Sequence, residues 1–291
     1  MPRRSAGPTP NARAAAPASR RPRRAARRSG VRALQHRLRR AFHAMPAAPL
    51  PLQILAGAAL LLALFFAVNW VVQVARKPAE MFFPVSGALN KPPAETWLRY
   101  GWLFREHSTA TITPELLAAL AQVEGAGNPV ARTYWRWHWT SQPFELYRPA
   151  SSAVGMYQIT DAAFREAKRY CIHDHAIAED GSWHDPRSCW FNRLYTRVVP
   201  SHAIEMTAAL LDRGVTNTLA RRGIAAATLQ QKQDLAAVIH LCGGGAGDAY
   251  ARRGLRPAAG QRCGDHDVAR YLAQLNTTKA QFRRIAAAEE D

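Results

Sequence analysis

The sequence predicts a mainly α-helical globular domain behind a single N-terminal transmembrane helix. Three observations lead to this fold class. A basic tail at residues 1–48 precedes an uncharged apolar stretch from Leu52 to Val74. From residue 111 onward, apolar residues recur mostly with helical spacing, and few runs alternate as a strand would. All four cysteines lie beyond the apolar stretch.

Residues 1–48 are the most basic part of the chain. They contain thirteen arginines, no lysine and no acidic residue, within a formal net charge of +18. Large apolar side chains are rare there, so we expect the tail to be disordered. An arginine-rich tail is typical of nucleic-acid binding, of a transit peptide or of contact with anionic lipid. The segment that follows decides between these interpretations.

That segment has the length of a membrane span. A helix of about 20 apolar residues crosses a bilayer, and we predict one at residues 49–75. A cleaved signal peptide has a shorter apolar core closer to the N-terminus, so we expect an uncleaved anchor. Thirteen arginines precede the span and only Arg76 and Lys77 directly follow it, which places the tail in the cytoplasm. Anionic lipid then accounts for the tail's charge, and we expect no specific nucleic-acid partner.

The exported part divides into a connector and a domain. Residues 76–110 contain two proline-bearing turns and a short aromatic helix near Trp97–Phe104, which is typical of a connector. Residues 111–291 form the predicted domain. Its expected helices are 114–124, 160–170, 187–211, 216–222, 230–241 and 266–288.

The four cysteines favour two disulfides, because their number is even and they lie on the exported side. Three pairings are possible, and the sequence does not choose among them. Cys171–Cys189 with Cys242–Cys263 is the simplest pairing. The spacing typical of a zinc site is absent, and the histidine-rich stretch at 173–185 is better interpreted as a solvent loop than as a metal site.

A carboxylate ends the first predicted helix of the domain. Thr113 and Pro114 suit the start of a helix, and the glycines after Glu124 allow a sharp exit. Glu124 continues the apolar face of this helix, which is made by Leu116, Leu117, Leu120 and Val123.

The position of Glu124 at the end of this helix raises the free energy of its charged form. The carboxyl group lies at the negative end of the helix dipole, next to apolar neighbours, and both effects favour the protonated acid that general acid catalysis requires. The alternative is a glutamate at the rim of the core, paired with an arginine.

Two motifs together resemble the leading motifs of the SLT-type lytic transglycosylases, which are relatives of goose-type lysozyme. They are EGAGNP at 124–129 and SAVGMYQIT at 152–160. The resemblance implies a lysozyme-like helical catalytic domain with Glu124 as the catalytic acid. It also implies substrate-binding roles for Asn128, Ser152, Gly155, Met156, Tyr157 and Gln158. The alternative for the second motif is a turn before an ordinary helix, with Met156 in the core.

Two further segments resemble the family less closely. LCGGGAGDAY, Leu241 to Tyr250, occupies the place of an Ala-Tyr-Asn-Ala-Gly segment, with Cys242 at the tyrosine. The segment from Asp267 to Phe282 resembles the closing family helix, with Tyr271 at its usual tyrosine.

The sequence also departs from the family between the two leading motifs. Gly125 replaces a usual serine, and 25 residues, 130–154, separate Pro129 from Gly155 where about ten are usual. This insertion is rich in tryptophan. We interpret it either as the wall of a saccharide groove or as a hairpin packed on the core of its own domain.

The resemblance implies cleavage of peptidoglycan between N-acetylmuramic acid and N-acetylglucosamine, with a 1,6-anhydro ring as product. Family members use one carboxylate and no cofactor or metal, and an inner-membrane protein with a periplasmic domain is implied. One alternative is a muramidase that uses water and a second carboxylate, for which Glu145, Asp161, Glu166 and Asp174 are the candidates. The other is a non-catalytic protein that binds peptidoglycan or assists envelope assembly.

Overall fold

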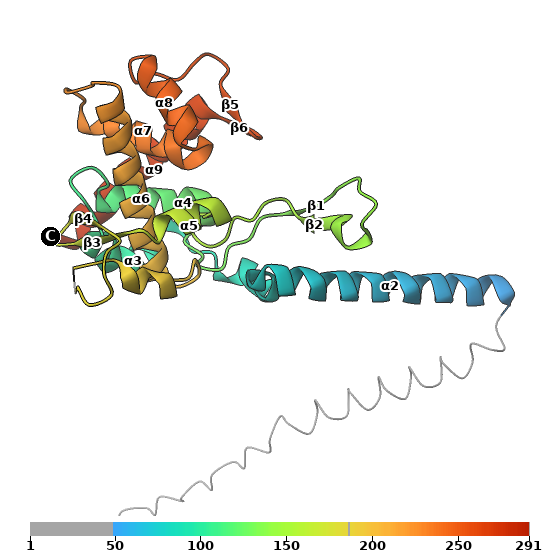
Figure 1. Ribbon diagram of the computed structural model, residues 1–291. Helices are drawn as coiled ribbons and strands as arrows, with labels where there is room; N and C mark the ends of the chain where they lie inside the picture. The colour runs from blue at the N-terminus through green and yellow to red at the C-terminus, as the bar shows by residue number, and fades with distance from the viewer. Residues whose placement is uncertain (1–48, 186, 291) are drawn as a thin grey trace, which may run out of the picture. The chain divides into compact units, whose positions relative to one another are not determined.

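The computed structural model describes residues 49–185 and 187–290 and is mainly helical (Figure 1). The predicted tail at 1–48 lies outside the described residues. The chain divides into two compact units between Phe66 and Ala67.

Helix α2, Leu50–Arg76, covers the predicted span. Within the described residues it is the one helix that is long and apolar enough to cross a membrane. Its leucines up to Leu64 are largely exposed, as a lipid-facing surface requires. The last turns of α2, from Ala67, belong to the second unit, where Asn69 and Gln73 are buried.

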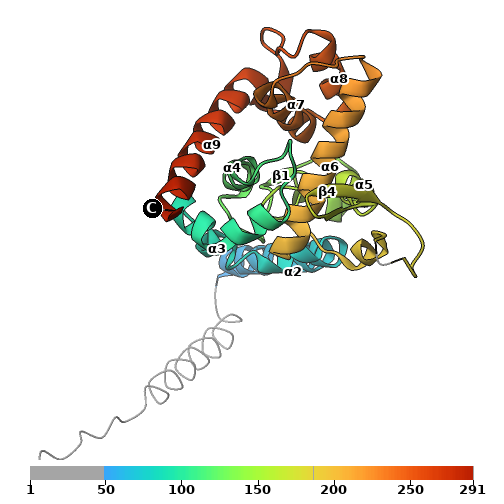
Figure 2. The same ribbon diagram turned by 90° about the vertical axis from the view of Figure 1, so that its left-hand side faces the viewer.

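The second unit has a helical body built around α4, Pro114–Gly125. Figure 2 shows α4 enclosed by neighbouring helices. Leu116, Leu117 and Leu120 of α4 have almost no exposed surface and form the centre of the core. The other helices of the body are α3 (Pro93–Glu106), α5 (Asp161–Ala167), α6 (Pro200–Arg221), α7 (Leu229–Cys242), α8 (Gly244–Arg252) and α9 (Val268–Glu290).

Helix α3 lies within the segment that we assigned to the connector, yet it belongs to the body. Its aromatic face is buried and packs with α4 and α9. Trp97 contacts Phe104 and Phe282, with ring centroids 6.1 and 5.9 Å apart. The part of the connector before α3 contains the short 3-10 helices η2 (Pro78–Phe82) and η3 (Ser86–Leu89).

The prediction of one helix at 187–211 was wrong. A short 3-10 helix, η5, covers Trp190–Leu194, and α6 begins only at Pro200. Proline fits the first turn of a helix and not its interior, so Pro200 fixes the start of α6. Helix α6 then continues through the separately predicted 216–222 segment and ends at Arg221.

The described part of this unit also contains three small antiparallel hairpins. The pair β1 (Trp135–Trp137) and β2 (Tyr147–Pro149) lies in the tryptophan-rich insertion, with the 3-10 helix η4 (Pro143–Glu145) in its loop. The other pairs are β3 (Tyr170–His173) with β4 (Ala176–Glu179), and β5 (Arg262–Cys263) with β6 (His266–Asp267). Because β3 begins at Tyr170, α5 is shorter than the predicted helix at 160–170.

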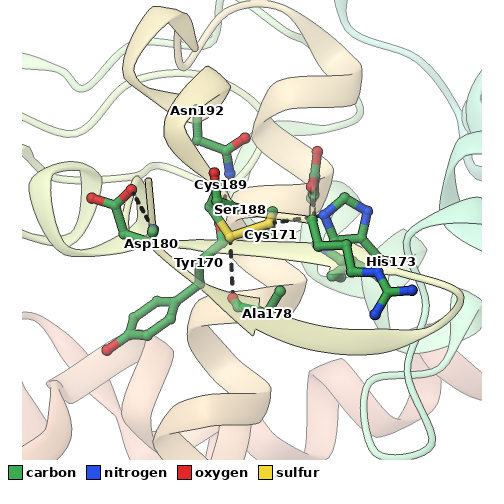
Figure 3. Close-up of a disulfide and its surroundings, with 12 residues drawn as sticks. Tyr170, Cys171, His173, Ala178, Asp180, Ser188, Cys189 and Asn192 are labelled. Carbon is green, nitrogen blue, oxygen red and sulfur yellow. Dashed lines mark hydrogen bonds between the residues drawn. A yellow bond between two sulfur atoms is a disulfide. The ribbon is translucent and has the colours of Figure 1, made fainter. Parts of the chain in front are cut away.

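The structure joins Cys171 to Cys189 and Cys242 to Cys263, which are the two sequence-local pairs. The first bond ties β3 to the segment before η5. Figure 3 shows it beside Asn192, whose amide donates a hydrogen bond of 2.6 Å to the carbonyl of Tyr170. The second bond ties the end of α7 to β5.

Candidate active site around Glu124

Glu124 lies in the last turn of α4, and the chain leaves the helix directly after it. Thr113 and Pro114 begin the helix, as their positions in the sequence predicted. Ala126 adopts the left-handed conformation with φ of 48°, and its N–H bonds back to the carbonyl of Gln122 at 3.0 Å. The Glu124 side chain keeps 17% of its surface exposed. Its carboxyl group is therefore close to the core and still reachable from solvent.

Two side chains from other helices approach this carboxyl group. The hydroxyl of Tyr271, in α9, donates a hydrogen bond of 2.6 Å to Oε1 of Glu124. Nε2 of His240, in α7, lies 3.7 Å from the same oxygen. Among the described residues, no lysine, arginine or second carboxylate pairs with Glu124. The structure therefore differs from the alternative interpretation, in which Glu124 lies at the rim of the core and pairs with an arginine.

Tyr271 is held as a hydrogen-bond donor. Burial raises the pKa of its hydroxyl well above the usual value, and the charge of Glu124 and their hydrogen bond raise this pKa further. The phenol therefore stays protonated over the physiological pH range. It can stabilise the ionised form of Glu124 without exchanging a proton with it.

A cavity lies beside each partner of Glu124. A small, mainly apolar cavity of about 60 Å³ has His240 in its lining, together with Gln158, Ile159 and Met206. A more open, polar pocket of about 300 Å³ has Tyr271 in its lining, together with Asp265, Asp267, Arg270 and Gln274. The pocket beside Tyr271 is large enough for several polar groups of a ligand.

Most of the predicted cleft segment is structural. Met156 and Tyr157 have no exposed surface, and the Tyr157 hydroxyl donates a hydrogen bond of 3.2 Å to the carbonyl of Leu117. The expectation that these two side chains contact substrate is therefore not supported, and the alternative that placed Met156 in the core describes the structure. Gly155 adopts φ of 82°, and a Cβ there would lie 2.3 Å from the carbonyl oxygen of Arg197. Glycine is thus required by the protein's own packing.

Gln158 and Ser152 are the more accessible members of the segment. Gln158 donates hydrogen bonds to the carbonyls of Gly155 at 2.9 Å and Ala131 at 3.2 Å, and it lines the cavity beside His240. The hydroxyl of Ser152 accepts a hydrogen bond of 3.1 Å from the N–H of Asp161, at the start of α5. Of the predicted binding residues in this segment, Gln158 has the position best suited to contact a ligand.

Asn128 holds the loop after α4. Its side chain is 1% exposed, donates to the carbonyl of Ser86 at 2.5 Å and to Asn90 at 2.9 Å, and accepts from the N–H of Val130 at 3.0 Å. These bonds use both N–H donors of the amide and one acceptor position of its oxygen. We therefore correct its predicted role from substrate binding to fixing the exit of α4.

The other candidate carboxylates are engaged elsewhere or exposed. Glu145 pairs with Arg76 and Arg148, and Asp161 pairs with Arg197 at 2.8 Å. Glu166 and Asp174 are exposed. Among the described residues, no group of His, Cys, Asp and Glu side chains is arranged to hold a metal ion.

Sequence reasoning missed His240. It is the one polar residue in the run from Ala236 to Cys242, and this interruption is the signal that could have drawn attention to it. Tyr271 was noticed only through the resemblance of the closing helix. Cys242, aligned with a family tyrosine, is in a disulfide, and the following glycines begin α8.

No protein-family model, curated protein or solved structure matches the chain. The chemical assignment accordingly depends on the geometry of the site. That geometry offers one accessible carboxyl group, a neutral hydroxyl donor beside it and a histidine close by, an arrangement suited to general acid–base catalysis.

Proposed function

We propose that the protein is a peptidoglycan lytic transglycosylase with Glu124 as its only catalytic acid and base. The observation that carries this proposal is the carboxyl group of Glu124 at a helix end, with Tyr271 as a hydrogen-bond donor at 2.6 Å and with no second carboxylate paired with it among the described residues. Glycosidases that use water generally need two flanking carboxylates. Asp265 and Asp267 line the pocket beside Tyr271, but among the described residues neither is hydrogen-bonded to Glu124, and we assign both proton transfers to Glu124.

Both proton transfers can be assigned to Glu124. As an acid, it protonates the oxygen that leaves with N-acetylglucosamine while the bond to C1 of N-acetylmuramic acid breaks. As a base, it then takes the proton of the muramoyl C6 hydroxyl, whose oxygen attacks C1 and closes the 1,6-anhydro ring. No water is consumed, and the enzyme ends with Glu124 protonated, as it began.

Tyr271 supports the step in which Glu124 is ionised. A hydrogen bond to a charged oxygen is stronger than one to a neutral oxygen, so the phenol stabilises the carboxylate that forms after the first transfer. Nε2 of His240 lies 3.7 Å from the same oxygen and is the second polar neighbour of the carboxyl group.

The proposed location follows from α2. This helix would anchor the chain as a single-pass protein of a bacterial inner membrane, with the basic tail on anionic lipid in the cytoplasm. The helical body would then lie in the periplasm, where the glycan strands of peptidoglycan are its substrate. A lysozyme-like arrangement of the body is part of the same proposal.

Product analysis tests the function. The full-length chain in detergent is incubated with purified peptidoglycan, and the released muropeptides are identified by mass spectrometry. Products that end in 1,6-anhydromuramic acid are expected, about 18 mass units lighter than the hydrated products because no water enters the bond. Reducing-end muramic acid as the main product would instead establish a muramidase.

Substitution of the acid tests the site. Glu124→Gln keeps the shape of the side chain but cannot transfer the proton, so turnover should fall by about 10³–10⁴-fold. The exposed Glu166 provides a matched control, and Glu166→Gln should retain activity. If the wild-type chain binds peptidoglycan without releasing any product, the protein is a non-catalytic binder.

A further inference from the structure

The tryptophan-rich hairpin, which we define as residues 133–149, is fixed to the end of the apolar helix α2. The amide of Asn69 donates a hydrogen bond of 2.7 Å to the carbonyl of Tyr147, and the amide of Gln73 donates one of 2.7 Å to the carbonyl of Phe144. Asn69 and Gln73 are 1% and 4% exposed. Backbone of the hairpin thus covers these two polar side chains. Exposure of the same side chains to lipid would cost free energy.

Two charged contacts strengthen the attachment. Arg76 forms an ion pair with Glu145 in the hairpin loop. Near the base of the hairpin, the fully buried Glu80 accepts hydrogen bonds from Arg132 at 2.7 Å and from the Trp135 indole at 2.9 Å. The hairpin is therefore held at several points between Glu80 in η2 and Asn69 in α2.

The outer part of the hairpin, which we define as residues 136–148, exposes large aromatic side chains. Trp137 is 62% exposed and Trp139 is completely exposed. The pairing of β1 with β2 sets Arg136 opposite Arg148, so two cations also lie in this region. Exposed aromatic rings next to arginines are typical of a surface that contacts lipid head groups.

The exposed aromatic side chains of the hairpin lie in two places. Tyr134, at the base of the hairpin, donates a hydrogen bond of 3.3 Å to Asp265, which lines the pocket beside Tyr271. Trp137 and Trp139 lie further out, toward the loop that bonds to Gln73 and the start of β2 that bonds to Asn69. A role in binding sugars suits the position of Tyr134, whereas the outer tryptophans need another explanation.

Helix geometry gives the depth of the outer part. Helix α2 has 27 residues and is about 40 Å long at 1.5 Å per residue, which matches a bilayer with its head-group regions. Asn69 lies seven residues before Arg76, the last residue of α2, or about 10 Å along the axis. The head-group region on each side is about 5 Å deep, so a hairpin bonded at Asn69 extends through the head groups and reaches the outer ends of the acyl chains.

We propose that the outer part of the hairpin is a membrane-binding element. Trp137 and Trp139 insert among the lipid head groups of the leaflet on the side of the helical body, and Arg136 contacts lipid phosphate. This inference requires α2 to span the membrane but is independent of the catalytic proposal. Lipid is favoured over glycan as the partner because the attachment is to a membrane-spanning helix.

Depth-dependent fluorescence quenching tests the proposal. The full-length variant Trp139→Cys is labelled with an environment-sensitive fluorophore and reconstituted into vesicles of phosphatidylethanolamine and phosphatidylglycerol. All four native cysteines are in disulfides, so only the introduced thiol reacts. Nitroxide lipids quench from the head group or from either end of the acyl chain, and iodide quenches from water. Quenching by head-group nitroxides and protection from iodide are expected.

Two labelled controls make the result decisive. Trp183 is also exposed, at 77%, but lies in a loop of the helical body, so a label on Trp183→Cys should be quenched by iodide and not by lipid. A label on Leu60→Cys, within α2, should be quenched by nitroxides near the acyl methyl end. If the Leu60 position is open to iodide, α2 does not span and the inference falls with it.

The remaining outcomes concern the partner and the attachment. Iodide quenching at position 139 as strong as at 183 would overturn the proposal. Protection that appears only when soluble glycan strands are added would also overturn it, in favour of sugar binding. In the double variant Asn69→Leu, Gln73→Leu, the label at 139 should lose its protection while the label at 183 is unchanged.

Discussion

Oε1 of Glu124 and the hydroxyl of Tyr271 lie 2.6 Å apart, although 147 residues separate them in the chain. The contact joins the C-terminal end of α4 to the first turn of α9. Because α4 is the central helix of the body and packs extensively on α9, the two groups are held by rigid elements. The orientation of the carboxyl group thus depends on the packing of these two helices.

The first prediction concerns this hydrogen bond. Tyr271→Phe removes the donor and keeps the ring, and a hydrogen bond to a charged group contributes about 1.5–3 kcal/mol, so kcat should fall by about 10- to 100-fold. KM should change much less, since the bond stabilises the carboxylate that forms during reaction. Steady-state kinetics on soluble glycan strands measures both. An unchanged kcat would show that Tyr271 has no part in the chemistry.

The second prediction concerns the residue after the acid. A Cβ on Gly125 would lie 2.7 Å from Cα of Met156, which is backbone and cannot rotate away. Gly125→Ala or Gly125→Ser, the latter being the residue usual in the resembling family, should therefore lower the free energy of unfolding by about 1–3 kcal/mol. Urea denaturation followed by circular dichroism provides the measurement.

The same substitution at an open position is the control for Gly125. Gly245 is exposed in helix α8, and a Cβ there would meet nothing within 4 Å. Gly245→Ala should raise the free energy of unfolding by up to about 1 kcal/mol through helix propensity. Equal effects of the two alanine substitutions would contradict the packing argument.

The third prediction concerns pH. Burial lowers the pKa values of His107 and His202, against the opposing charge of Glu205. A folded-state pKa below the unfolded value of about 6.5 means that the unfolded chain binds protons more readily. The contribution of the two histidines to stability should be fully present above about pH 6.5 and be lost as the pH falls from there through the lower folded-state pKa values. Urea midpoints measured across this range should decrease toward acid, and His107→Gln with His202→Gln should flatten the dependence.

The fourth prediction compares the disulfides. The paired cysteines are 18 and 21 residues apart, and loops of this size are worth roughly 3 kcal/mol each on the chain-entropy estimate. Replacing either pair with serine should lower the free energy of unfolding by a similar amount. Loss of Cys242–Cys263 should also lower kcat in the chain that remains folded, because α7 carries His240 and β5 precedes the helix of Tyr271. Equal activity of the two variants would refute this difference.

Local signals in the sequence were sufficient for α4 and α7. Thr113, Pro114 and the glycines after Glu124 predicted α4 almost to the residue, and α7 runs one residue past each predicted end. Helix α8 was missed because its three glycines indicate a turn. Its close packing requires one of them, since a Cβ on Gly247 would lie 2.5 Å from Ile239 in α7.

The site was predictable only in part, for a physical reason. Glu124 can be identified from the sequence around it, because the signals that end α4 directly follow it. Its partners come from helices 116 and 147 residues further along, and a helical pattern does not say which helices will meet. The motif around Met156 and Tyr157 was interpreted as a cleft surface, and both side chains are buried, because a pattern of apolar residues does not distinguish a cleft surface from a core.

The Cys242–Cys263 bond has a consequence for the timing of activity. It closes the stretch between the helices that supply His240 and Tyr271, and such a bond forms in oxidising compartments and not in the cytoplasm. With the location proposed above, a newly made chain would lack this link until its helical body had crossed the membrane. With the function proposed above, the site would then be completed only in the compartment that holds the peptidoglycan, and oxidation of Cys242 and Cys263 would be the step that completes it.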